Sequence, residues 1–113
     1  MNCYRIQGGR RLYGNVKIQG SKNAALPMIA ASLLCRGTVI LHNCPKILDV
    51  YSMLSILKNL GCNVRWEQNT VVIAADGLFS CQVPEKYAGA MRSSVMLFGP
   101  LLGRIGCANI AYP

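Results

Sequence analysis

The sequence has few acidic residues: four Asp and Glu stand against twelve Lys and Arg, which gives a net charge of +8. Charged residues of either sign make up 14% of the chain and hydrophobic residues 52%. This balance excludes a disordered chain, which combines low hydrophobicity with high charge. The positive surplus predicts an anionic ligand. We expect small anions rather than nucleic acid, because the basic residues are scattered and the aromatic residues do not alternate with them.

Long hydrophobic runs are also missing. The longest, residues 24–35, contains Pro27 and Ser32 and is shorter than the roughly 18–20 residues that a membrane-spanning helix needs. No hydrophobic segment follows the first charges, as it would in a secretory signal. The 113 residues correspond to about one small domain. The sequence therefore predicts a soluble, cytoplasmic protein with no membrane partner.

Closely spaced metal ligands are absent as well. The chain has one histidine, His42, and no Cys-x-x-Cys motif, whereas structural zinc sites use paired ligands at short spacing. An even number of cysteines in a short chain is typical of disulfides, but these require an oxidising compartment. We therefore expect buried, reduced thiols and neither a metal nor another cofactor. The six cysteines are Cys3, Cys35, Cys44, Cys62, Cys81 and Cys107.

Short alternating or β-branched segments predict strands in several places. Two of them, residues 4–7 and 15–19, precede the first helical pattern and end at glycines. The others are residues 38–41, a hairpin of residues 63–67 and 70–74, and residues 107–112.

The spacing of hydrophobic residues indicates three helices between these strands. The first begins near Asn23, since Pro27 is tolerated only in or near a first helical turn. The second has Asp49 as its N-cap. The third begins at about Glu85 and is interrupted at Gly99-Pro100. Strands and helices in this order indicate an α/β (α+β) fold.

The segment Gly20-Ser21-Lys22-Asn23 lies where a predicted strand ends and the first helix begins. Unpaired N–H groups and the positive end of the helix dipole favour an anion there, and Lys22 adds a full charge. Ser21 and Asn23 are also ordinary helix caps. From the residues alone, helix capping and anion binding are both open interpretations of this segment.

Arg92 is the second candidate, because it lies among small or hydrophobic residues early in the third predicted helix. In such surroundings a guanidinium binds a phosphate or carboxylate through paired hydrogen bonds. The alternative is a side chain that simply extends to the surface. His42 and Asp49, at the two ends of a predicted loop, are expected to be structural.

At these two sites the chain resembles the UDP-N-acetylglucosamine 1-carboxyvinyltransferases, a family of enolpyruvyl transferases. Residues 20–27, Gly-Ser-Lys-Asn-Ala-Ala-Leu-Pro, are similar to the family's opening motif. Residues 91–94 resemble its Met-Arg-Ala-Ser, and residues 99–104 its Gly-Pro-Leu-x-Ala-Arg. The resemblance covers essentially the whole chain. The sister family of 5-enolpyruvylshikimate-3-phosphate synthases typically has Gly-Ser-Lys-Ser and a later Asn-Arg pair, so it is the poorer match.

The resemblance implies a reaction and its substrates. Family members transfer the enolpyruvyl group of phosphoenolpyruvate to the 3-hydroxyl of UDP-N-acetylglucosamine and release phosphate, in the first committed step of peptidoglycan synthesis. By position, Lys22 and Asn23 match residues that bind phosphoenolpyruvate, and Arg92 matches the arginine that binds the UDP-sugar. No cofactor is implied, and the expected partners are these two small molecules.

The resemblance also implies that the chain is incomplete. Family members fold as an inside-out α/β barrel of two domains built from βαβαββ repeats. Residues 1–20 would be strands that pack with a missing C-terminal domain, and residues 21–113 an incomplete N-terminal domain. The general-acid cysteine is expected just after Pro113, so none of the residues present is expected to be catalytic. The fragment alone is expected to be inactive, and the alternative is a non-catalytic or weakly UDP-sugar-binding remnant.

Overall fold

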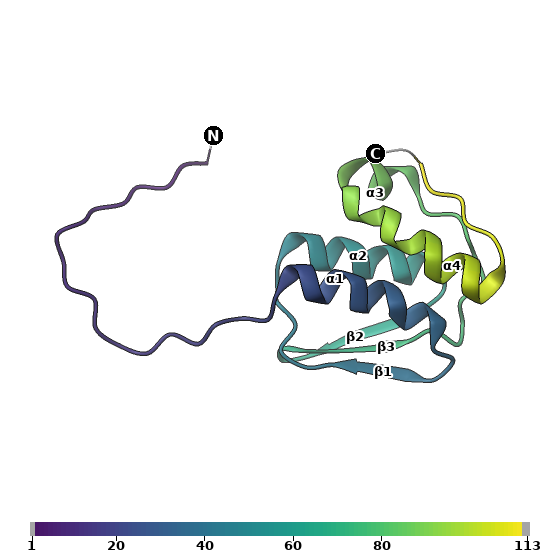
Figure 1. Cartoon of the computed structure of the whole chain (residues 1–113), viewed down its shortest axis with the longest axis horizontal. Helices are drawn as coiled ribbons and strands as arrows, with labels where there is room; N and C mark the ends of the chain where they lie inside the picture. The colour runs from purple at the N-terminus through teal and green to yellow at the C-terminus, as the bar shows by residue number, and fades with distance from the viewer. Residues whose placement is uncertain (1, 112–113) are drawn as a thin grey trace.

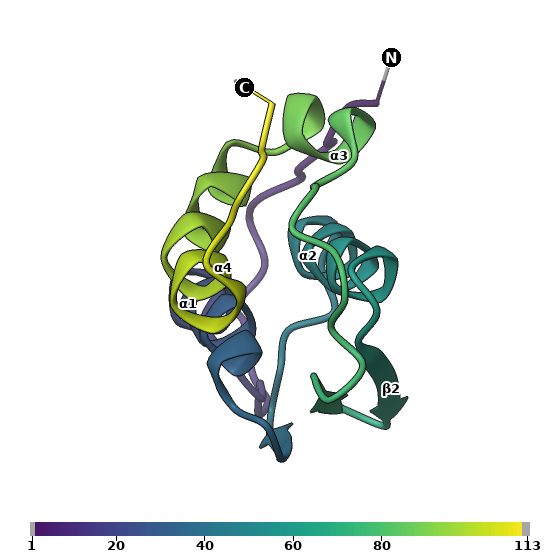
Figure 2. The same ribbon diagram turned by 90° about the vertical axis from the view of Figure 1, so that its right-hand side faces the viewer.

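The computed structural model describes residues 2–111. A three-stranded sheet forms one layer, and the helices α1 (Lys22–Ala31) and α2 (Leu48–Asn59) cover one of its faces (Figure 1). The later helices α3 (Glu85–Ala90) and α4 (Phe98–Ile105) lie against this pair on the side away from the sheet (Figure 2). The arrangement confirms the α/β (α+β) class.

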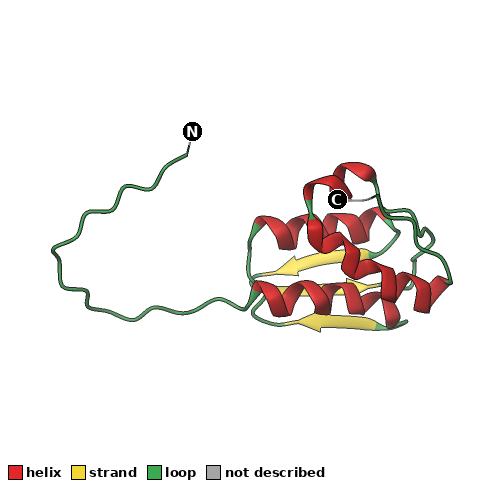
Figure 3. Ribbon diagram, turned by 45° about the horizontal axis from the view of Figure 1, so that its top comes forward, coloured by secondary structure: helices red, strands yellow, loops and turns green. Residues whose placement is uncertain are grey.

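The sheet consists of β1 (Thr38–Leu41), β2 (Asn63–Glu67) and β3 (Thr70–Ala74), in the spatial order β1-β3-β2 with both pairs antiparallel (Figure 3). All three strands lie where the sequence pattern predicts them. The tight turn between β2 and β3 uses Gln68 in a left-handed backbone conformation (φ 55°). Ile73 of the central strand is fully buried, because it faces the covering helices.

The first helix begins at Lys22, close to Asn23 as predicted. Of the two candidate caps, Ser21 is the N-cap, and its hydroxyl accepts a hydrogen bond from the N–H of Ala24 (3.3 Å). Pro27 lies in the second turn of α1. Because proline has no N–H, the Asn23 carbonyl four residues earlier receives no helical hydrogen bond.

The prediction that Asp49 caps the second helix is wrong. The N-cap is Ile47, which has an extended backbone (φ −124°, ψ 161°), and Asp49 lies inside the first turn. Ile47 packs against the core, and this contact fixes the entry of the chain into α2 before Asp49 is reached. A carboxylate in the first turn is still favourable, because it faces the positive end of the helix.

The third predicted helix is divided into α3, a 3₁₀ helix η2 (Arg92–Leu97) and α4. The break falls at Met91, whose backbone is extended (φ −146°, ψ 106°), and not at Gly99-Pro100 as predicted. Met91 is buried, so this change of direction is anchored in the core. Pro100 lies in the first turn of α4, where its missing N–H is not needed.

Residues 2–20 contain no strand, so the strands predicted at residues 4–7 and 15–19 are not formed. The segment runs away from the body as an extended chain (Figure 1), and residues such as Tyr13 are fully exposed. A strand needs a neighbour to satisfy its backbone groups, and in the described part of the chain the sheet pairs only β1, β2 and β3.

The strand predicted at residues 107–112 is reduced to one parallel bridge between Gln82 and Asn109. The N–H of Asn109 donates to the Cys81 carbonyl, and the Asn109 carbonyl accepts from the N–H of Val83, both at 2.9 Å. Only one residue on each side is bridged, so no regular ladder develops. Tyr112 lies outside the described residues.

The expectation of six reduced thiols is wrong for two of them. Cys81 and Cys107 form a disulfide, with their Cα atoms 5.8 Å apart, because the bridge beside them brings the two segments together. The other four thiols are free, and only half of these are buried as expected: Cys44 and Cys62 are buried, whereas Cys3 and Cys35 are exposed.

The hydrophobic core lies between the sheet and the helices α1 and α2, and it continues between this helix pair and α4. Its fully buried side chains include Ile29 of α1, Met53 and Leu57 of α2, and Leu101 of α4. Within residues 2–111, none of the helices combines the length and the hydrophobicity needed to cross a membrane.

Candidate functional site

The start of α1 is held against the loop between β1 and α2. Gly20 approaches this loop so closely that a Cβ on it would overlap the Asn43 carbonyl oxygen and lie 3.3 Å from Cδ of Pro45. Asn43 itself has a left-handed backbone conformation (φ 52°). The glycine that opens the Gly-Ser-Lys-Asn segment is therefore required by packing, and it fixes where Lys22 begins the helix.

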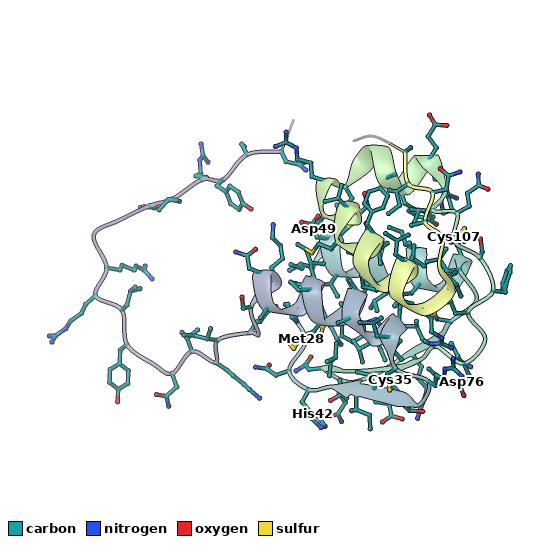
Figure 4. All side chains as sticks on the ribbon, turned by 45° about the vertical axis from the view of Figure 1, so that its right-hand side comes forward. Met28, Cys35, His42, Asp49, Asp76 and Cys107 are labelled. Atoms are coloured by element: carbon teal, nitrogen blue, oxygen red, sulfur yellow. A yellow bond between two sulfur atoms is a disulfide. The ribbon has the colours of Figure 1, made fainter. Side chains whose placement is uncertain are left out.

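Lys22 forms an ion pair with Asp49: its Nζ lies 3.2 Å from Oδ2 of the carboxylate. The two helices pack side by side and begin at the same end of the body (Figure 1), so the first residue of α1 meets the first turn of α2. Figure 4 shows Asp49 on the side of the body from which residues 2–20 extend. The side chains are 49% and 41% exposed, so a dissolved anion can reach the pair.

The helix start itself also favours an anion. The N–H groups of Lys22 and Asn23, the first two helical residues, have no partner within the helix. They form the positive end of the helix dipole, next to the full charge of the ammonium. Asn23 is exposed, and since Ser21 caps the helix, its side-chain amide is not needed for that purpose. Capping by Ser21 and anion binding by its neighbours are thus compatible.

Two small hollows flank Asn43 near this helix start. One, of about 170 Å³, lies between the start of α1 and the β1–α2 loop, and the other, of about 210 Å³, between that loop and residues 17–19. Lys17 and Lys46 line the larger one. Lys22 and Asp49 line neither, so the candidate site is an open surface rather than an enclosed pocket.

The residues behind the loop have a structural role. Nδ1 of His42 lies 3.3 Å from Oγ1 of Thr70, a hydrogen bond that ties the loop to β3. The Cys44 thiol is buried, and burial raises its pKa. It therefore stays protonated at neutral pH and is not a nucleophile. Residues 2–111 contain no group of three or more His, Cys, Asp or Glu side chains that could hold a metal ion.

Arg92 is the first residue of η2 and is exposed. Within residues 2–111 its guanidinium forms neither an ion pair nor a hydrogen bond with another side chain, so it is available to an anion. Because η2 packs against α1, the elements that carry Lys22 and Arg92 are neighbours. Among the described residues, the two side chains share no ion-pair or hydrogen-bond partner.

Asp49 is the residue of this site that the sequence did not identify. We expect it to be structural, and its contact with Lys22, 27 residues earlier, depends on the packing of α1 against α2. The only signal in the sequence was that both residues stand near predicted helix starts, each beside a loop.

Comparison with known proteins gives consistent matches over this whole region. Residues 6–112 match the family model of EPSP synthase (3-phosphoshikimate 1-carboxyvinyltransferase). UDP-N-acetylglucosamine 1-carboxyvinyltransferase 1 of Halalkalibacterium halodurans is 46% identical over 109 residues, which cover 96% of this chain and 25% of the relative. The enzyme of the same name from Thermotoga maritima is 44% identical over 108 residues, which cover 96% of this chain and 26% of the relative.

A solved structure shares the fold. The crystal structure of the enolpyruvyl transferase NikO from Streptomyces tendae superposes with a TM-score of 0.81 and 26% sequence identity, over 89% of this chain and 24% of that chain. The chain thus spans about a quarter of the length of the relatives that it matches.

Proposed function

Because this chain belongs to the EPSP synthase (3-phosphoshikimate 1-carboxyvinyltransferase) family, we propose that it is the N-terminal part of a UDP-N-acetylglucosamine 1-carboxyvinyltransferase. The whole enzyme transfers the enolpyruvyl group of phosphoenolpyruvate to the 3-hydroxyl of UDP-N-acetylglucosamine and releases phosphate. This is the committed step of peptidoglycan synthesis, in the cytoplasm. The names of the relatives at 40–46% identity support this acceptor rather than a shikimate derivative.

The observation that carries the proposal is the half-exposed ammonium of Lys22 at the start of α1. Phosphoenolpyruvate has a phosphate and a carboxylate, and the unpaired N–H groups of Lys22 and Asn23 provide a matching positive surface. We assign Lys22 and Asn23 to phosphoenolpyruvate. In the reaction the acceptor hydroxyl adds to C2 while C3 gains a proton, and loss of phosphate and of a C3 proton then restores the double bond. A fixed ammonium stabilises the charge on the phosphate as it departs.

We assign Arg92 to UDP-N-acetylglucosamine. Its guanidinium is exposed and has no carboxylate partner within the described residues, and a planar fork of donors suits a diphosphate. The general acid would be supplied by a cysteine beyond Pro113. The six cysteines present are not at that position, and two of them are joined to each other.

The division of the chain follows from the same proposal. Residues 1–20 would become strands by pairing with a C-terminal domain, and residues 21–113 belong to the N-terminal domain. The exposed hydrophobic side chains of the N-terminal segment, among them Tyr4, Ile6 and Val16, support this, since a soluble chain rarely leaves such residues uncovered.

A chimeric enzyme tests the proposal directly. In it, the matching 109 residues of the Halalkalibacterium halodurans relative are replaced by this chain, and phosphate release is measured with both substrates present. We expect turnover with UDP-N-acetylglucosamine as acceptor, none with shikimate 3-phosphate, and none from the 113-residue chain alone, because preorganised groups from both domains are needed. A folded chimera without turnover would favour a non-catalytic remnant, and turnover with shikimate 3-phosphate would favour the sister activity.

A further inference from the structure

We propose that Asp49 is a positioning residue for Lys22. Its carboxylate holds the ammonium at the start of α1, oriented for the phosphoenolpyruvate of the proposed function, on which this inference rests. The contact that carries the inference is the 3.2 Å ion pair between the two helix starts.

Lys22 needs such a partner because of where it lies. A cation at the first position of a helix is repelled by the positive end of the helix dipole. The flexible four-carbon side chain of lysine allows the ammonium to turn away from that end. Within residues 2–111, Asp49 is the ion-pair partner of Lys22. Without that carboxylate, the ammonium would move away from the N–H groups of Lys22 and Asn23 into solvent.

Asp49 is well placed to hold the ammonium. It lies in the first turn of α2, where the helix dipole favours a negative charge. Its neighbours fix that turn: Ile47 packs against the core and Val50 is fully buried. The carboxylate is therefore attached to an anchored part of the backbone.

The ion pair leaves room for a ligand. An ammonium has three N–H donors, and Asp49 accepts through one oxygen, Oδ2. With the lysine side chain half exposed, a phosphate or carboxylate can take the remaining donors without displacing Asp49. Asp49 therefore remains in place when the ligand binds, and contributes by orienting the ammonium rather than by touching the ligand.

The second ion pair of the described chain provides a matched control. Arg65 and Glu67 both lie on β2, and their side chains are 61% and 57% exposed. This pair involves no helix start, and both residues are on the exposed face of β2, opposite the face that carries the buried Val64. Glu67→Gln removes one carboxylate from the surface in the same way as Asp49→Asn, with the same change in net charge.

The experiment compares the full 113-residue chain with Asp49→Asn, Asp49→Glu and Glu67→Gln by NMR, following the Lys22 Cε methylene protons during titration with phosphoenolpyruvate. In the original chain we expect two distinct Cε proton signals, because a held side chain does not average them. Asp49→Asn is expected to merge them and to weaken phosphoenolpyruvate binding about two- to fivefold, the size of one exposed ion pair. Asp49→Glu should keep the two signals partly separate and should weaken phosphoenolpyruvate binding less than Asp49→Asn does. Glu67→Gln should change neither the signals nor the affinity.

A double variant separates positioning from a general effect of charge. In a Lys22→Ala background, Asp49→Asn should cause no further loss of binding. If Asp49→Asn leaves the Lys22 signals distinct, or tightens phosphoenolpyruvate binding, the positioning role is overturned. If the signals merge but neither the chain nor the chimeric enzyme responds to phosphoenolpyruvate, the assignment of Lys22 under the proposed function fails while the contact with Asp49 stands. Unchanged backbone amide signals outside the two helix starts verify that each variant is folded.

Discussion

The Arg104 guanidinium donates a 2.8 Å hydrogen bond to the carbonyl of Leu33, and this contact ties α4 to the end of the first helix. Leu33 lies in η1 (Ser32–Leu34), a 3₁₀ helix that continues α1. The same guanidinium donates to the carbonyls of Cys35 (3.3 Å) and Ala75 (3.1 Å). One side chain thus provides partners for carbonyl groups that a helix end and a strand end would otherwise leave unpaired.

Arg104→Ala should therefore lower the free energy of unfolding. Hydrogen bonds to a charged group contribute about 1.5–3 kcal/mol each, and loss of a donor leaves half-buried carbonyls without a partner, so we expect a loss of about 2–4 kcal/mol. Urea unfolding followed by circular dichroism measures it. Arg36→Ala is the control, since Arg36 is exposed and should change stability by less than about 0.5 kcal/mol. Equal stability of the two variants would mean that Arg104 does not fasten α4.

Gly20→Ala should destabilise the start of α1. The added Cβ would overlap the Asn43 carbonyl oxygen, so either the β1–α2 loop or the helix start must move, at a cost of about 1–3 kcal/mol. Gly8→Ala is the matched control, because no atom lies within 4 Å of the corresponding Cβ. Thermal unfolding of both variants checks the prediction. If Gly20→Ala were as stable as Gly8→Ala, the close approach would not hold the loop in place.

The body of the fold could be predicted from local patterns. Alternating hydrophobic residues predict three strands with one helix-covered face, and all three strands form where predicted. The residues concerned are Val39 and Leu41, Val64, and Val71 and Ile73. Such segments depend mainly on their own hydrophobic pattern. The N-terminal strands could not form, because they depend on a neighbour that the described chain does not supply.

The errors concern features that depend on contacts between distant segments. The disulfide requires Cys81 to meet Cys107, 26 residues later, and the ion pair of Asp49 with Lys22 requires α1 to pack against α2. The break at Met91 depends on burial of that side chain. Gly99-Pro100 resembles a helix break in the sequence, but Pro100 lies in the first turn of α4, where proline is common. In the candidate site, the sequence predicts binding roles for Lys22, Asn23 and Arg92, which stay predictions, but it does not predict the ion pair between Lys22 and Asp49.

The Cys81–Cys107 disulfide should stabilise the chain by joining segments 26 residues apart. Closing a loop of that length in the unfolded chain corresponds to about 3.5 kcal/mol in the chain-entropy account. We expect Cys107→Ser to unfold at a correspondingly lower urea concentration than the oxidised chain. Cys3→Ser, which removes an exposed free thiol, should unfold at the same urea concentration as the oxidised chain. Adding a reductant should abolish the difference between the original chain and Cys107→Ser. A difference that persists in reductant would have to come from packing instead.

Burial of Cys62 predicts a loss of stability at alkaline pH. Desolvation raises the pKa of this thiol from 9.0 to about 11, with Arg104 partly opposing the shift. Between these values the unfolded chain has lost the proton while the folded chain retains it, so the free energy of unfolding falls as pH rises from about 9 to 11. Cys62→Ala should show a smaller fall over this range than the original chain, in urea unfolding at several pH values. Cys35→Ser, at an exposed thiol, should follow the original chain, and identical profiles for all three would contradict a buried, protonated Cys62.

Arg92→Ala separates binding from stability more cleanly than any other substitution in the site. The side chain is exposed and has no side-chain partner within the described residues, so its removal should change the free energy of unfolding by less than about 0.5 kcal/mol. If it binds UDP-N-acetylglucosamine, the same substitution should weaken that ligand by about 1.5–3 kcal/mol, the value of a charge-assisted hydrogen bond. Calorimetric titration of the chain and of the chimeric enzyme measures the affinity. Lys22→Ala serves as the control, because it should weaken phosphoenolpyruvate and leave the UDP-sugar nearly unaffected. Loss of both ligands in either variant would mean that the two cations act on one shared anion, and the assignment of separate substrates would then be wrong.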